Sequence, residues 1–192
     1  NTKISDFLDY TKQCKKIIKR MKVPEESDIK ECFVQLPFAS EIGFGPGKKR
    51  LAIFDLDETL IHCETQNADL AEQKVEVTLP GNVKRTIGVN IRPHWKEELL
   101  KLMDKYFFIV YTASHQSYAD AVINVLDKDE EIFKYRLYRN NCSVVTVEGQ
   151  KFFVKDLRVI QGVSLKDMVI IDNSLLSFAF HLNNGVPILP YY

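Results

Sequence analysis

The stretch LAIFDLDETLIH, residues 51–62, places two aspartates directly after a short apolar run. The run from Leu51 to Phe54 is typical of a strand that is buried on both faces of a parallel sheet. Asp55 and Asp57 then stand at the end of that strand, where each carboxylate needs a partner or water. The stretch therefore predicts a buried strand that delivers two carboxylates to one edge of a sheet.

Length and composition favour one compact domain with appendages. The 192 residues are 45% hydrophobic, and they carry 26 basic and 26 acidic side chains. This zero net charge does not predict direct binding of nucleic acid. The four cysteines form no C-x-x-C pair, which favours reduced thiols in an intracellular protein of the nucleus or cytoplasm. No apolar run reaches the roughly 18 to 20 residues of a transmembrane helix, and we expect a monomer.

Residues 1–47 are expected to form an N-terminal amphipathic helix and a connector. Apolar residues such as Ile4, Phe7 and Leu8 recur at helical spacing over 1–22, and lysines occupy much of the remaining surface. Such a helix can dock on a membrane or an acidic partner, but packing on its own domain is the preferred interpretation. SEIGFGPGKKR (40–50) reads as the connector, and 48–192 as the domain proper.

From residue 48 onward, strand patterns alternate with helical patterns. Strands are predicted at 51–54, 107–111, 135–138 and 168–171, helices after Arg92-Pro93 and at 115–126 and 156–163, and hairpins at 75–79 with 83–90 (turn Pro80-Gly81-Asn82) and at 143–154. Strands separated by helices imply βαβ units. The expected fold class is therefore α/β, with a mainly parallel central sheet flanked by helices and a small antiparallel insertion.

Three of these strands end in polar residues. Asp55 follows LAIF, Thr112 follows FFIVY, and Asp172-Asn173 follows MVII. Ligands of open parallel α/β sheets lie at the carboxyl ends of the strands, and Mg²⁺ prefers carboxylate and carbonyl oxygens such as these. Two aspartates in different environments, here Asp55 and Asp57, can act as nucleophile and general acid. The sequence therefore predicts phosphoryl transfer assisted by Mg²⁺.

The block DLDET at 55–59 resembles the D-x-D-x-T signature of haloacid-dehalogenase (HAD) phosphotransferases. Within them it is similar to the FCP/SCP-type small C-terminal-domain phosphatases, the NLI-interacting-factor-like family. Six more blocks resemble that family in the same order: RPH (92–94), YTAS (111–114), YAD (118–120), RLYRNNC (136–142), FVKDL (153–157) and IIDNS (170–174). The resemblance implies an HAD-type Rossmann-like fold. It also implies a further helix after FAFHLNNGVPI (178–188), so the C-terminus is expected to be truncated.

The same resemblance implies catalytic roles by position. Asp55 would attack the substrate phosphorus and form an aspartyl-phosphate, while Asp57 would protonate the leaving alcohol and then activate water. Thr112 and Lys155 would hold phosphoryl oxygens. Such a cluster agrees with elementary electrostatics, because an anion attacks an anion only after cations have neutralised part of the charge.

The resemblance also implies a metal site and substrate contacts. Mg²⁺ would be held by Asp55, the main-chain carbonyl of Asp57 and Asn173, with Asp172 beside it. The residues expected to bind substrate are Thr59, Arg139, Tyr118 and position 113 in the block YTAS.

The insertion at 64–90 bears on the substrate, because it is too short to form a separate cap domain. The site is therefore expected to be open, as a protein substrate requires. Val75, Val77 and Ile87 are expected to line an apolar pocket with Tyr118, whereas His115 stands where an apolar pocket residue would be expected. The resemblance implies a phosphoserine or phosphothreonine protein as substrate, with the RNA polymerase II C-terminal domain as one candidate.

Two alternatives to a Mg²⁺-dependent protein serine/threonine phosphatase remain open. One is a small-molecule phosphatase of the same superfamily, and the other is a non-catalytic phosphoprotein-binding module. The presence of Asp55, Asp57 and Lys155 favours catalysis. The four histidines lack the spacing of metal ligands and are expected to be structural or superficial.

Overall fold

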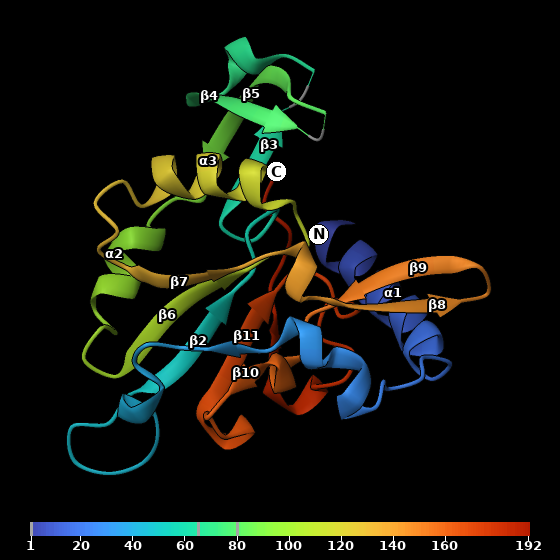
Figure 1. Ribbon diagram of the computed structural model, residues 1–192. Coiled ribbons are helices and arrows are strands. Elements are labelled where there is room, and N and C mark those ends of the chain that lie inside the picture. Colours follow the sequence, from blue (N-terminus) through green and yellow to red (C-terminus); the bar gives the residue numbers. More distant parts are fainter. Residues whose placement is uncertain (1, 65, 80) are drawn as a thin grey trace.

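A five-stranded parallel sheet forms the centre of the computed structural model, which describes residues 2–64, 66–79 and 81–192 (Figure 1). Every neighbouring pair of strands in it is parallel. The strands are, in spatial order, β12 (Gly185–Pro187), β11 (Met168–Asp172), β2 (Arg50–Phe54), β6 (Tyr106–Tyr111) and β7 (Phe133–Leu137). The predicted α/β class with a parallel central sheet is thus confirmed.

Two helices, α2 (Trp95–Leu100) and α3 (Gln116–Leu126), cover one face of this sheet (Figure 1). Successive residues of a strand point to opposite faces, so Ala52 belongs to the core that includes α3, whereas Leu51 and Ile53 belong to the core on the other face. No helix within the described part of the chain is long and apolar enough to cross a membrane.

The N-terminal extension contributes to the second core. Helix α1 (Thr2–Ile18) buries Cys14 there, and the following segment adds Ile29 and Leu36. Strand β1 (Val34–Gln35) pairs in parallel with β10 (Ile160–Gln161). The helix therefore packs on its own domain, although it ends at Ile18 rather than continuing to residue 22.

A three-stranded antiparallel sheet forms the insertion and stands beyond α3 from the central sheet (Figure 1). Its order is β3 (Ile61–Glu64), β5 (Val83–Ile91) and β4 (Gln73–Leu79). The predicted hairpin is present, with turn residue Pro80 outside the described residues. The predicted pocket is wrong: Val75, Val77 and Ile87 are buried in the core that includes α3, so they serve packing instead.

The predicted helix at 156–163 is wrong. The chain instead makes one 3-10 turn, Leu157–Val159, and then enters β10. Val159 and Ile160 are β-branched and buried, which favours extended backbone, and Gly162 has a φ of 77°, a conformation that ends regular structure. The hairpin before it, β8 (Ser143–Val147) with β9 (Gln150–Val154), agrees with the prediction.

A buried charge network ties this turn to distant segments. The carboxylate of Asp156 accepts hydrogen bonds from His181 Nε2 at 2.8 Å and from Arg158 Nη2 at 2.6 Å. Arg158 also donates to the carbonyl of Pro24 at 3.0 Å. Burial by itself would raise the pKa of Asp156, but the hydrogen bonds from His181 and Arg158 outweigh it and hold that pKa well below its usual range. The ionised form is therefore part of the fold.

We expect Asp156→Asn to lower the free energy of unfolding at pH 7 by about 2–4 kcal/mol, since the half-buried Arg158 and the buried His181 lose their carboxylate partner. A lowered carboxyl pKa contributes stability that is complete above the unfolded value of about 4 and is lost as the pH falls below it. The difference in the free energy of unfolding between wild type and variant should therefore be smaller by roughly 2 kcal/mol at pH 2.5 than at pH 7. Urea unfolding at pH 7, 4 and 2.5 measures it, with the exposed Asp129→Asn as control. A constant difference over that range would contradict this assignment.

Candidate active site

The three polar strand ends meet at one edge of the central sheet. Strands β11, β2 and β6 are adjacent, and their registers align Ile171 with Phe54 and Phe54 with Val110. The residues that follow, including Asp55 and Asp172, therefore leave the sheet side by side. This juxtaposition depends on strand order, which brings together segments more than 100 residues apart in sequence.

Lys155 is the centre of this edge. Its ammonium group donates to Asp55 Oδ1 and to Asp172 Oδ2, the latter at 2.6 Å, and all three side chains are buried. Burial by itself would lower the pKa of Lys155, but the carboxylates of Asp172 and Asp55 outweigh it and hold the pKa above its usual value. Burial and the neighbouring Asp55 raise the pKa of Asp172, against the effect of Lys155. One fixed cation thus holds two carboxylates together.

Thr59 joins Asp55 to Asn173. The Thr59 hydroxyl donates to Asp55 Oδ2 at 3.0 Å and accepts from the Asn173 main-chain N–H at 3.2 Å. It also lies 3.4 Å from Asn173 Oδ1. An oxygen of Asp55 and the side-chain oxygen of Asn173 are therefore both within reach of one hydroxyl group.

The side-chain oxygens of Asp55, Asn173 and Asp172 are the candidate ligands for a metal ion at this edge of the sheet. No group of three or more His, Cys, Asp and Glu side chains in the described part of the chain has a metal-site arrangement. Both oxygens of Asp172 are engaged, by Lys155 and by the Ser174 main-chain N–H at 2.8 Å. The oxygens of Asp55 also accept hydrogen bonds, from Lys155 and Thr59, but the Asp55 carboxylate and the Asn173 amide oxygen lie together at Thr59, so these two side chains would supply the oxygen ligands for an ion. Such a sparse set of hard oxygens fits an ion of the Mg²⁺ type, which keeps several water ligands.

Asp57 lies in a different environment from Asp55. Its carboxylate accepts hydrogen bonds from Ser114 Oγ at 2.8 Å and from the Tyr118 hydroxyl at 2.5 Å. Burial raises the pKa of Asp57, and the charge of Asp55 adds to this, while the bonds from Tyr118 and Ser114 act in the opposite direction. Burial therefore favours the protonated form of Asp57.

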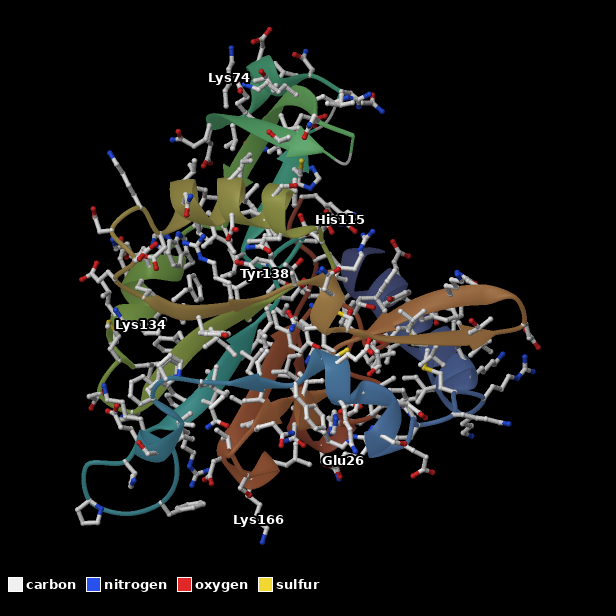
Figure 2. All side chains as sticks on the ribbon, in the orientation of Figure 1. Glu26, Lys74, His115, Lys134, Tyr138 and Lys166 are labelled. Atoms are coloured by element: carbon white, nitrogen blue, oxygen red, sulfur yellow. The ribbon has the colours of Figure 1, made fainter. Side chains whose placement is uncertain are left out.

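A hollow of about 470 Å³ opens in front of Asp57. Arg139 lines it and donates from Nε to the carbonyl of Ala113 at 2.6 Å, with Nη1 3.0 Å from His115 Nε2. Its guanidinium stacks on Phe153, 4.7 Å from the ring centroid. Figure 2 shows His115 at the start of α3, between the antiparallel insertion and the hairpin β8–β9. The lining of the hollow therefore includes both the Arg139 guanidinium and the Asp57 carboxylate.

Two positions that were expected to contact the phosphorylated substrate, 112 and 113, lie directly after β6. Position 113 is an alanine, and its main-chain carbonyl accepts a hydrogen bond from Arg139. The serine of YTAS is Ser114, whose hydroxyl donates to the Asp57 carboxylate. Thr112 is buried, and its hydroxyl accepts from the Ser114 main-chain N–H at 3.0 Å. Thr112 thus lies at the end of β6 and supports the loop that carries Ser114.

Sequence reasoning missed Arg92 as a support of the site. Arg92 donates to the carbonyls of Thr59 at 2.5 Å, of Glu58 at 3.3 Å and of Leu189 at 2.9 Å. Glu58 has a φ of 56°, an uncommon value for a residue with a side chain. The block RPH was the sequence feature that could have indicated this role, because an arginine outside any charge cluster can donate hydrogen bonds to backbone carbonyls. Arg92 holds the turn that follows the two aspartates.

Comparison with known proteins matches residues 50–192 to the model of the family "NLI interacting factor-like phosphatase". A CTD small phosphatase-like protein 2 of Dictyostelium discoideum is 40% identical over 73% of this chain and 24% of its own length. Nuclear envelope morphology protein 1 of Schizosaccharomyces pombe is 36% identical over 73% of this chain and 29% of its own. The chain thus spans about a quarter of these two relatives.

A solved structure has the same fold. The fission yeast RNA polymerase II CTD phosphatase Fcp1, bound to beryllium fluoride, aligns with a TM-score of 0.61 at 19% identity, over 74% of this chain and 42% of that one. The HAD-type fold expected from the sequence is therefore confirmed. Through residues 50–192, which contain both motif aspartates, Lys155 and Asn173, the chain belongs to the NLI interacting factor-like phosphatase family.

Proposed function

We propose that this chain is a Mg²⁺-dependent protein serine/threonine phosphatase in which Asp55 is the nucleophile and Asp57 the general acid. The observation that carries the proposal is the different surroundings of the two aspartates. Asp55 is paired with the buried Lys155, whereas Asp57 faces Ser114 and Tyr118 in the open hollow. Two acids with divergent environments can divide the roles of nucleophile and proton donor.

In the first step an oxygen of Asp55 forms a bond to the substrate phosphorus as the bond to the serine or threonine oxygen breaks. Asp57 gives its proton to that leaving oxygen. In the second step the Asp57 carboxylate takes a proton from water, whose oxygen attacks the aspartyl-phosphate. The bond between phosphorus and Asp55 then breaks and releases inorganic phosphate. Lys155 stays protonated throughout and offsets the charge that gathers at Asp55.

Asp55, Asn173 and the main-chain carbonyl of Asp57 are the groups that would hold Mg²⁺, with Asp172 beside them. The ion supplies positive charge that offsets the phosphoryl oxygens. Arg139 and Thr59 would contact the substrate or its phosphate; Arg139 lines the hollow and Thr59 lies beside Asp55, which supports these roles.

A phosphoprotein is the substrate class that the site favours. The hollow before Asp57 is open and lies on the surface between Arg139 and the insertion, so a chain segment can reach it. Curated relatives are described as CTD small phosphatase-like proteins, and the solved relative as an RNA polymerase II CTD phosphatase. The polymerase tail is therefore one candidate substrate among intracellular phosphoproteins.

We expect Asp55→Asn to lower the turnover of p-nitrophenyl phosphate at least about 1,000-fold, because the amide is a poor nucleophile. The variant should stay folded, because Lys155 keeps its hydrogen bond and ion pair with Asp172. Acid quenching with radiolabelled substrate should trap a phosphoenzyme in wild type and none in the variant. Asp129→Asn, an exposed aspartate, serves as the matched control. A phosphoenzyme in the Asp55 variant would exclude it as nucleophile.

Asp57→Asn should affect poor leaving groups most. Serine needs a proton to leave, so we expect the rate on a phosphoserine peptide to fall at least about tenfold more than the rate on p-nitrophenyl phosphate. Steady-state kcat on both substrates measures this, with Asp104→Asn as a surface control. Equal losses on the two substrates would mean that Asp57 acts in another way.

Removal of divalent metal by EDTA should abolish turnover, and added Mg²⁺ should restore it. Asn173→Ala should raise the Mg²⁺ concentration for half-maximal activity by at least about tenfold, because one of few oxygen donors is lost. The exposed Asn124→Ala is the matched control. Full activity after exhaustive chelation would contradict the metal assignment.

A further inference from the structure

Helix α1 packs against two elements that carry residues of the candidate active site. Figure 1 shows it beside the hairpin β8–β9, and Ile17 packs against the small apolar core to which that hairpin contributes. The end of the hairpin delivers Lys155. Cys14 is buried in the same core as Phe178 of the segment 173–180, which follows β11 and which we call the Asn173 loop.

Three hydrogen bonds hold the first two residues of the Asn173 loop. The main-chain N–H of Asn173 donates to the Thr59 hydroxyl at 3.2 Å, and that of Ser174 donates to Asp172 Oδ1 at 2.8 Å. The third bond comes from α1, because the Tyr10 hydroxyl and Ser174 Oγ are hydrogen-bonded at 2.8 Å. The residue next to Asn173 is therefore fixed by the helix.

The Asn173 loop also reaches the buried lysine. The main-chain N–H of Ser177 donates to the carbonyl of Ser174 at 3.1 Å, and the main-chain N–H of Lys155 donates to the carbonyl of Ser177 at 2.6 Å. A shift of Ser174 would thus be passed to Asn173 along the chain and to Lys155 through Ser177.

The side chain of Asn173 depends on this backbone for its direction. Among the described residues, the hydrogen bond of its amide oxygen is the one with the Thr59 hydroxyl, and at 3.4 Å it is long. Mg²⁺ demands near-ideal octahedral geometry, so a displaced ligand oxygen weakens its binding. Groups that do not touch a metal ion but orient its ligands therefore affect metal affinity.

We propose that Tyr10 is a positioning residue for the Mg²⁺ site, which acts by holding Ser174 and thereby the backbone that directs the Asn173 oxygen. The inference rests on the proposed function, because it takes Asn173 as a ligand of Mg²⁺. The match to the family model begins at residue 50, whereas α1 ends at Ile18. The metal affinity of the family domain is thus coupled to a helix outside it.

The test compares metal binding by wild type, Tyr10→Phe and Ser174→Ala. Each substitution removes one side of the same hydrogen bond and leaves the main-chain bonds of the loop in place. The probe is Mn²⁺, which prefers the same oxygen ligands as Mg²⁺, and the electron paramagnetic resonance signal of the free ion gives its Kd without turnover. Tyr138→Phe is the matched control, because Tyr138 is also partly buried and its hydroxyl donates to Asp120 at 2.7 Å.

Tyr10→Phe and Ser174→Ala should each raise the Kd for Mn²⁺ about threefold, the factor expected for one hydrogen bond of ordinary strength. The Mg²⁺ concentration for half-maximal turnover of p-nitrophenyl phosphate should rise by the same factor, while kcat at saturating Mg²⁺ stays within about twofold of wild type. The double variant should lose no more than either single variant, because both remove the same bond. In an Asn173→Ala background, Tyr10→Phe should change the Kd no further.

Three results would overturn the positioning role of Tyr10. They are a wild-type Kd for Mn²⁺ in either folded variant, a threefold loss that persists in the Asn173→Ala background, and an equal loss in Tyr138→Phe. Urea unfolding shows whether each variant is folded, and Ser174→Ala decides the question alone if Tyr10→Phe does not fold. Failure of the metal assignment looks different: wild type itself would bind no Mn²⁺ and keep full turnover after chelation, and the role of Tyr10 would be excluded with it.

Discussion

The buried ammonium group of Lys155 is the interaction on which this edge of the molecule depends. Asp55 and Asp172 end neighbouring parallel strands, so their carboxylates are forced close together in a region from which water is largely excluded. Two unpaired charges there would be very unfavourable. Lys155, delivered by the end of hairpin β8–β9, neutralises part of this charge and fixes both carboxylates in place.

The position of Lys155 is itself maintained by its neighbour. Asp156 follows it directly and is held by His181 and Arg158, which connect the turn to the C-terminal segment and to the region around Pro24. A fully buried carboxylate with cationic and imidazole partners gives this turn a single conformation. Lys155 is therefore supported by contacts with two distant parts of the chain, the segment around His181 and the segment around Pro24.

The surroundings of the two motif aspartates differ because the chain turns between them. Asp55 still lies at the strand end and faces Lys155, whereas Asp57, two residues later, reaches Ser114 and Tyr118 near the start of α3. The hydroxyl partners hold the half-buried Asp57 carboxylate at the edge of the hollow, where partial burial raises its pKa and favours the protonated form. A short turn supported by Arg92 thus creates two chemical environments from one sequence motif.

The sequence by itself determined the strand pattern and the chemistry of the strand ends. Apolar runs that alternate with helical patterns predicted the parallel sheet. Asp55, Thr112 and Asp172 directly follow three of these runs, so they were expected at the carboxyl edge of the sheet. Patterns of this kind are local and follow from backbone periodicity. The same locality explains the failed helix at 156–163, where the buried environment of Val159 and Ile160 and the pairing of β10 with β1 outweighed the local signal.

Only the tertiary structure decided which groups touch. It brought the Ser114 hydroxyl to Asp57, buried Val75 and Val77 in the core that includes α3, and brought α1 to the loop of Asn173 through Tyr10 and Ser174. These contacts join residues up to 164 positions apart. They depend on strand order and on the packing of whole elements, and neither leaves a periodic trace in the sequence.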